Sequence, residues 1–115
     1  MTAFGEKVML LHKVELKEYG KGVKADFVHS ENVTVAFWSI PEGTSLPAHD
    51  HPHEQIVNLR EGEFELTVGN ETERLTSGSV VVIPSGIVHS GRAVTQCRVI
   101  DTFHPVREDF AFSAD

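Results

Sequence analysis

The sequence of 115 residues lacks several features that define large classes of proteins. It has one cysteine, Cys97, which excludes an intramolecular disulfide framework. Its 10 Lys and Arg against 17 Asp and Glu give a net charge of −7, whereas a protein that binds nucleic-acid phosphates needs a basic face. No signal-peptide core follows the first residues, and no apolar stretch approaches the roughly 20 residues of a membrane span. We therefore expect a cytoplasmic protein with neither a nucleic-acid nor a membrane partner.

Long uninterrupted segments are also missing. Between Gly20 and Gly91, Gly, Pro or Asn interrupts the chain so often that no segment reaches the length of a typical helix. The runs between these breaks are rich in Val, Ile, Thr and Phe, which favours strands. These runs are Val33–Ile40, Gln55–Arg60, Glu63–Val68, Thr72–Leu75, Val80–Ile83 and Arg98–Phe103. Many short strands with closely spaced turns predict an all-β fold, either a sandwich or a barrel.

The clearest strand pattern lies in residues 63–68, where polar and apolar side chains alternate. Residues 68–71 follow it with a Gly-Asn pair, which predicts a hairpin turn. Helix is expected only near the ends of the chain. For Lys7–Tyr19 a strand is at least as good an interpretation, and Arg107–Phe112 fits a last helical turn or an edge strand. Neither a linker nor an internal repeat divides residues 1–115, which we treat as a single domain.

Histidine is the residue type that the sequence has in excess. Three of its seven histidines lie between positions 49 and 53. Alternation along a strand would put residues 49, 51, 53 and 55 on one face, where neutral imidazole nitrogens can converge on a divalent metal. A further histidine, His89, follows a second strand broken by Gly and Pro. The alternative interpretation is a surface histidine cluster where a loop meets a strand.

Two segments, residues 43–62 and 78–93, resemble the two motifs of the cupin superfamily. The first motif, G-x5-H-x-H-x3or4-E-x6-G, is matched by Gly43, His49, His51, Gln55 and Gly62, with Gln in place of Glu. The second motif, G-x5-P-x-G-x2-H-x3-N, is matched by Gly78, Pro84, Gly86 and His89, with Ala93 in place of Asn. The resemblance implies a single cupin domain over 1–115, folded as a double-stranded β-helix (jelly-roll barrel). It also implies a metal inside the barrel, held by His49, His51, Gln55 and His89.

Gln55 changes the expected chemistry of that metal site. Three neutral imidazoles and a neutral amide leave the +2 charge of the ion intact, whereas a carboxylate would lower the site to +1. Compared with an ion that has a carboxylate ligand, we expect this ion to be a stronger Lewis acid and to be oxidised less readily. This favours ring-opening chemistry over a dioxygenase. The expected cofactor is one divalent transition metal (Zn, Ni, Mn or Fe), because imidazole suits several of them. His53 has the parity of a ligand but follows Pro52, so we place it beside the metal.

A second informative stretch lies near the C-terminus. Asp101 and Phe103 share one face of an expected strand. An acid on the inward face of an apolar strand is costly unless it is paired or functional. The plain alternatives are an ion pair between Asp101 and Arg107, a core position for Phe103 and a solvated position for Arg107.

Three segments also resemble the small pectin-degradation cupins that linearise unsaturated uronates. The pattern H-x-H-P-H-E-Q matches His49–Gln55, E-G-E-F-E matches Glu61–Glu65, and D-x-F-x-P-x-R-E-D-[YF] matches residues 101–110. The resemblance implies an enzyme that converts 4,5-unsaturated uronate monosaccharides from pectin or alginate to linear 5-keto-4-deoxyuronate. It places Asp101, Phe103 and Arg107 in the catalytic site beside the metal.

Other interpretations remain open from the sequence. Another metal-cupin enzyme (a dioxygenase, lyase or polyketide cyclase) would use the same metal, and a non-catalytic small-molecule-binding cupin would bind an anion at the barrel mouth. The expected partner is a small acidic sugar or another small anion. The family resemblance also implies a homodimer, for which Val8–Leu16 is the candidate intersubunit strand.

Overall fold

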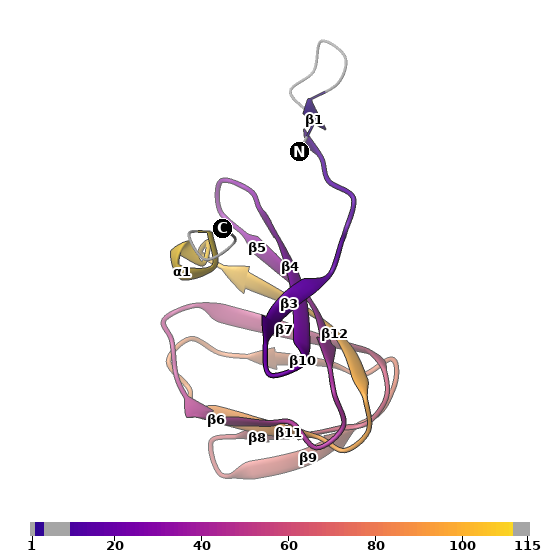
Figure 1. The fold of residues 1–115 in the computed structure, drawn as a ribbon. Helices are drawn as coiled ribbons and strands as arrows, with labels where there is room; N and C mark the ends of the chain where they lie inside the picture. The colour runs from indigo at the N-terminus through magenta and orange to yellow at the C-terminus, as the bar shows by residue number, and fades with distance from the viewer. Residues whose placement is uncertain (1, 4–9, 112–115) are drawn as a thin grey trace.

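The computed structural model describes residues 2–3 and 10–111, and within them nearly every element is a strand (Figure 1). In chain order the elements are β1 (Thr2–Ala3), β2 (Leu10–Leu11), β3 (Lys17–Gly20), β4 (Val23–His29), β5 (Thr34–Ile40), β6 (Ser45–His49), β7 (Glu54–Glu61), β8 (Phe64–Val68), β9 (Glu71–Leu75), β10 (Val80–Ile83), β11 (His89–Ala93), β12 (Cys97–His104) and α1 (Glu108–Ala111). No helix in these residues is long and apolar enough to cross a membrane.

Two antiparallel sheets face each other across the core (Figure 1). The six-stranded sheet has the order β10-β7-β12-β5-β4-β3, and the four-stranded sheet has the order β6-β11-β8-β9. Strands that are neighbours in a sheet are often distant in sequence, as β12 lies between β5 and β7. This arrangement confirms the expected all-β jelly-roll barrel.

Alternating burial explains which residues face the interior. On β12 the exposure alternates along the strand, so Cys97, Val99, Asp101 and Phe103 are buried. The same alternation buries Phe64 and Leu66 on β8, as the sequence predicted. Apolar side chains from both sheets form one core, which comprises Ile40, Val57, Leu59, Phe64, Leu66, Leu75, Ile83, Ala93, Cys97 and Val99. Burial of one such side chain stabilises the fold by roughly 1.5–3 kcal/mol.

Two glycines are required by close packing. Gly62, the last residue of the first motif, has φ 93°, and a Cβ at this position would collide with the carbonyl oxygen of Gln96. A Cβ on Gly91, in the middle of β11, would collide with the ring of Phe64. Gly91 therefore lets β11 approach the core closely, although glycine in the sequence looked like a break.

The expected runs correspond to β5, β7, β8, β9, β10 and β12, and no end differs by more than one residue. The expected hairpin joins β8 and β9, and the last turn is the short helix α1. Strands β4, β6 and β11 lie outside the expected runs. Pro47 interrupts β6 and Gly91 interrupts β11, so neither segment has the sequence of a regular strand. Part of Lys7–Tyr19 lies outside the described residues, and the rest includes β2 and most of β3.

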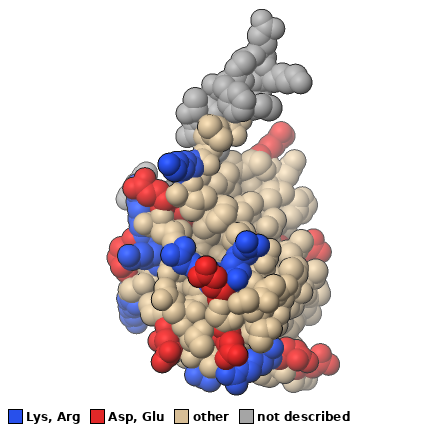
Figure 2. All heavy atoms as spheres, turned by 90° about the vertical axis from the view of Figure 1, so that its right-hand side faces the viewer, with Lys and Arg blue, Asp and Glu red and all other residues tan. Residues whose placement is uncertain are grey.

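Charged side chains of both signs are interspersed on the surface. On the face drawn in Figure 2, Lys and Arg lie beside Asp and Glu in its middle and lower parts, and the upper right carries few charges. The net charge of −7 is therefore not gathered into a continuous acidic area on this face.

Candidate metal centre and ligand cavity

The imidazoles of His49, His51 and His89, called the three site histidines below, converge on one point. Their ligand atoms all lie within 4.8 Å of one another. Antiparallel pairing of β6 with β11 puts His49 directly opposite His89, and their ring centroids are 4.3 Å apart. The ring centroid of His51 is 4.9 Å from that of His89. Such a cluster has the size of a metal site and confirms that the chain can present three histidines to one ion.

The expectation that residues 49, 51, 53 and 55 share one face of a strand is wrong. β6 ends at His49 and β7 begins at Glu54, so His51 lies in the loop between them. This loop carries the chain from the four-stranded sheet to the six-stranded sheet, and it includes Pro52, which has no amide hydrogen to donate to a ladder. The site is therefore built from both sheets and a loop.

Each of the three site histidines is oriented by a backbone carbonyl. Nδ1 of His49 lies 2.8 Å from the oxygen of Pro47, Nδ1 of His51 lies 3.0 Å from the oxygen of His53, and Nδ1 of His89 lies 2.9 Å from the oxygen of Ile87. A carbonyl oxygen only accepts, so each Nδ1 carries the proton and each Nε2 keeps its lone pair. Metal-binding histidines are oriented in this way, with the other ring nitrogen donating to a fixed acceptor.

Two contacts indicate that the site fits a divalent cation. Nε2 of His89 is buried without a hydrogen-bond partner in the described residues. Nε2 of His51 lies 3.1 Å from Oε1 of Gln55, so two acceptors face each other when the imidazole is neutral. Burial lowers the pKa of both histidines, and nearby positive charge acts in the same direction, so imidazolium does not resolve the conflict. A cation held by the three site histidines and Gln55 would satisfy these atoms.

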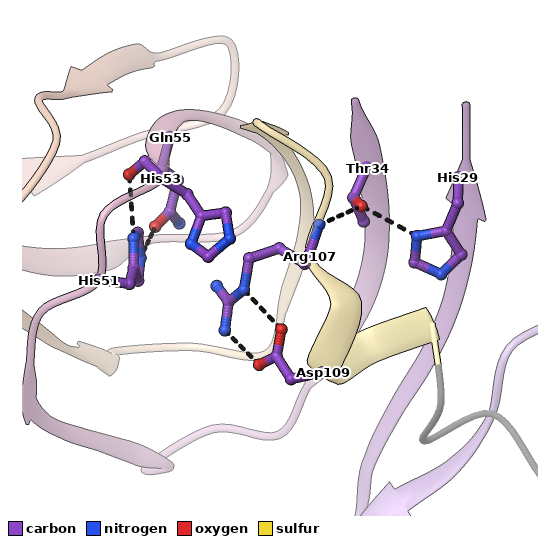
Figure 3. A network of polar contacts seen from close by, with 7 residues as sticks. All are labelled: His29, Thr34, His51, His53, Gln55, Arg107 and Asp109. Atoms are coloured by element: carbon purple, nitrogen blue, oxygen red, sulfur yellow. Dashed lines mark hydrogen bonds and ion pairs between the residues drawn. The ribbon is translucent and has the colours of Figure 1, made fainter. Parts of the chain in front are cut away.

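His53 takes a different position from the three site histidines. It lies outside their cluster, and its backbone oxygen accepts the hydrogen bond from His51. Its ring packs beside that of His51, with centroids 5.5 Å apart (Figure 3). Burial and the charge of Arg107 lower its pKa. His53 thus orients a candidate ligand, His51, through its backbone.

Asp101 is a buried acid in the wall of the same site. Burial raises its pKa to about 7, although the side chains of Gln55 and Trp38 and the charge of Arg107 act in the opposite direction. Its Oδ1 atom has no hydrogen-bond partner among the described residues. A carboxyl group with this pKa can hold or release a proton near neutral pH, which is typical of general acid–base groups.

Arg107 does not form the ion pair with Asp101 that the sequence left open. It pairs instead with Asp109, through Nε to Oδ1 at 2.9 Å and Nη2 to Oδ2 at 2.7 Å (Figure 3). Its guanidinium also stacks over the rings of Phe103 and Phe110, at 4.8 and 4.2 Å from their centroids. Arg107 lowers the pKa of Asp109 by this hydrogen bonding. The pair leaves Nη1 on the side of His51 and His53, turned away from Asp109 (Figure 3).

A cavity of about 500 Å³ joins these groups. All the site residues proposed from the sequence line it, namely His49, His51, Gln55, His89, Asp101, Phe103 and Arg107. Its volume is in the usual range for a small-molecule site. Much of the remaining wall is apolar and includes Val57, Phe64, Leu75 and Val99.

The sequence did not identify several residues around this cavity. Tyr19, Trp38 and Phe110 also line it, and Asp109 holds Arg107. Asp109 belongs to the C-terminal pattern, which was the only signal for it. Tyr19 and Trp38 lie on distant strands that only the sheet order brings to the site.

The chain belongs to the cupin family, because the family model described as a cupin domain matches residues 36–103. It is 28% identical to the pectin degradation protein KdgF of Dickeya dadantii over 97 residues, which are 82% of this chain and 88% of that protein. The solved structure of KdgF from Halomonas sp. matches with a TM-score of 0.79 at 26% identity, over 84% of this chain and 93% of that chain. The HTH-type transcriptional regulator PuuR of Escherichia coli is 29% identical over 87% of this chain, which spans only 58% of the regulator.

Proposed function

We propose that this cupin is a metal-dependent enzyme that opens 4,5-unsaturated uronate monosaccharides to linear 5-keto-4-deoxyuronate. The observation that carries the proposal is one cavity lined by the three site histidines, the buried carboxyl group of Asp101 and the guanidinium of Arg107. The similarity to pectin degradation protein KdgF supports it. A small acidic sugar is accordingly the proposed partner.

The reaction needs a proton, a water molecule and a fixed carboxylate. The substrate is a cyclic enol ether with a carboxylate at C5. A proton adds to C4 and water adds to C5, which forms a hemiketal. The bond from C5 to the ring oxygen then breaks, a ketone forms at C5, and loss of water from C1 leaves the aldehyde. The product therefore has the same formula as the substrate.

Residues of the cavity can meet two of these needs, the proton and the fixed carboxylate. Asp101 would donate the proton to C4. Arg107 would bind the carboxylate through its free edge, because guanidinium geometry suits a carboxylate. Phe103 would pack against the sugar and exclude water. A divalent cation held by the three site histidines and Gln55 would supply Lewis-acid polarisation when bound.

The direct test follows the conjugated alkene of the substrate. Purified protein, supplied with a divalent metal, is incubated with unsaturated galacturonate, and the loss of alkene absorbance is recorded. We expect the rate to exceed the spontaneous rate and to scale with protein concentration. A rate equal to that without protein would reject the proposal.

Arg107→Met is expected to raise the KM for the uronate by about 10–100-fold, because a hydrogen bond between charged groups contributes roughly 1.5–3 kcal/mol. Arg107→Lys should recover only part of this loss, since an ammonium group cannot reproduce the planar contacts with Asp109 and two rings. Steady-state kinetics measures both effects. Arg74→Met, which removes an arginine paired with Glu63 on the surface, is the control and should leave the KM unchanged.

The apolar wall of the cavity favours a second candidate function. Val57, Phe64 and Leu75 offer no hydrogen bonds to sugar hydroxyls from their side chains. An anion with an apolar body would fit this wall, and another metal-cupin enzyme such as a dioxygenase, lyase or polyketide cyclase would use it. Oxygen uptake with phenolic carboxylates separates a dioxygenase from a non-redox enzyme. Tight binding of such an anion without turnover would instead indicate a non-catalytic binding module. The similarity with PuuR, a transcriptional regulator, is in keeping with this alternative.

We also propose a homodimer in which the segment around β2 packs against a second copy of the chain. Leu10 and Leu11 are 58% and 60% exposed, and β2 pairs only with the two residues of β1 among the described strands. A two-stranded ribbon of this size is not stable by itself in water. Figure 1 shows this arm extending away from the two sheets. Residues 8 and 9 of the candidate strand Val8–Leu16 lie outside the described residues.

Replacement of both Leu10 and Leu11 by Lys is therefore expected to convert the dimer to a monomer of 12.7 kDa. Gel filtration with light scattering at micromolar concentration measures the mass. Val80→Lys, at an equally exposed apolar position on the edge strand β10, is the matched control and should leave the dimer intact. A monomeric wild-type protein at these concentrations would contradict the proposal.

A further inference from the structure

We infer that Thr34 is a positioning residue that holds Arg107 in place for an anionic ligand, and that His29 supports the Thr34 hydroxyl through a second hydrogen bond. The inference rests on the proposed function only for the choice of ligand, a small uronate. It assigns a role in the site to two residues of neighbouring strands, β5 and β4, that belong to neither cupin motif.

The central contact joins the backbone of Arg107 to a buried hydroxyl. The amide of Arg107 donates to Oγ1 of Thr34 at 2.8 Å, across 73 positions of sequence. Thr34 is 0% exposed, so no water molecule can replace this hydroxyl without rearrangement. Nδ1 of His29 lies 2.9 Å from the same oxygen (Figure 3). The hydroxyl thus lies between a ring of β4 and the chain segment that carries Arg107.

The Thr34 hydroxyl can serve both of its partners at the same time. The amide of Arg107 can only donate, so the Thr34 oxygen accepts from it. The hydroxyl has a second lone pair and one proton, so either tautomer of a neutral His29 can complete the contact through Nδ1. Burial lowers the pKa of His29, which keeps the ring neutral.

Arg107 is held at both ends by this arrangement. Thr34 fixes its backbone, while Asp109 and the rings of Phe103 and Phe110 fix its guanidinium. The side chain of Arg107 is 13% exposed. A cation fixed in this way loses little further freedom when an anion binds. Loss of the Thr34 hydroxyl would leave the amide of Arg107 without its acceptor and shift the guanidinium relative to the cavity.

Thr34→Val and Thr34→Ser form a matched pair, because valine keeps the shape without the hydroxyl and serine keeps the hydroxyl. Calorimetry measures the Kd for D-galacturonate, a stable uronate, with galactose as the uncharged control. We expect Thr34→Val to weaken galacturonate binding by about tenfold, the value of one hydrogen bond, and Thr34→Ser by less than about twofold. With a reacting uronate, Thr34→Val should raise KM and leave kcat nearly unchanged.

A double-mutant cycle separates positioning from general destabilisation. In the Arg107→Met background, Thr34→Val should have no further effect on galacturonate binding, because the group that Thr34 positions is absent. A second pair tests His29: His29→Asn keeps a hydrogen-bonding group near the place of Nδ1 and should bind as the wild type does, whereas His29→Phe removes this group and should resemble Thr34→Val.

Three results would overturn the inference. They are unchanged galacturonate binding by Thr34→Val, an equal loss in the Arg107→Met background, and wild-type binding that is absent or independent of Arg107. Failure of the proposed function gives a different result. The wild type would then bind galacturonate in a manner that depends on Arg107 and Thr34, yet the unsaturated uronate would not be consumed.

Discussion

Asp101→Asn is expected to lower the rate of uronate ring opening by about 10²–10⁴-fold, the usual contribution of a general acid. Asparagine has nearly the same shape, so the cavity and the buried face of β12 are kept. It cannot donate a carboxyl proton to C4 of the substrate. The loss should therefore fall on kcat, while the Kd for a non-reacting uronate changes little. Steady-state kinetics together with calorimetry measures the two quantities separately.

The position of Asp101 makes this variant a sharp test. Its carboxyl group is buried in the cavity wall beside Gln55 and Trp38, and its Oδ1 atom has no hydrogen-bond partner in the described residues. Glu73→Gln, at an exposed position on β9, removes an equivalent acid from the surface and should keep full activity. An active, folded and metal-loaded Asp101→Asn protein would show that the proton comes from elsewhere.

His89→Ala is expected to abolish both metal binding and ring opening, with a loss of activity of at least about 100-fold. His89 is 5% exposed, and the lone pair of its Nε2 has no partner in the described residues. Its removal leaves only two imidazoles and one amide for the ion. Metal content after reconstitution and dialysis measures the first effect, and the alkene absorbance measures the second.

Two further proteins complete this experiment. His104→Ala, at the exposed end of β12, removes a histidine outside the cluster and should keep both the metal and the activity. Removal of the metal from the wild type by a chelator should abolish ring opening, and addition of the metal should restore it. Retention of one metal per chain by His89→Ala would contradict the assigned ligand set.

Gln55 offers a more specific test of the charge of the site. Gln55→Glu restores the acid of the first motif and should bind a divalent cation more tightly, since it adds a negative charge beside the ion. The same charge should weaken the Lewis acid and repel an anionic substrate. We expect a higher metal affinity together with a lower kcat/KM for the uronate. This opposite change in two measurements distinguishes an electrostatic role for Gln55 from a purely structural one.

The local pattern of the sequence was enough to predict six of the strands and the list of candidate site residues. Alternation identified the buried faces of β8 and β12, because successive side chains of any strand point to opposite sides. The motif spacing selected the histidines, since turns and strands of constant length keep ligands at constant intervals. These are properties of short segments, so they can be read without knowledge of the partner strands.

Other features depended on contacts between distant segments. His49, His51 and Gln55 do not lie on one strand, because the chain crosses between the sheets at Pro52. The partner of Arg107 is Asp109 and not Asp101. The three backbone carbonyls that orient the site histidines lie within two residues of their rings, yet only the folded loops aim all three Nε2 atoms at one point.

The sequence by itself thus determined the all-β class, the cupin motifs and the chemical identity of the site residues, because these follow from residue type and local spacing. The tertiary structure decided how these residues are arranged. The burial of Asp101, the contact of Arg107 with Thr34 and the apolar wall of the cavity arise where segments far apart in the sequence pack together. Hydrogen-bond geometry and desolvation depend on that packing, and no local pattern encodes them.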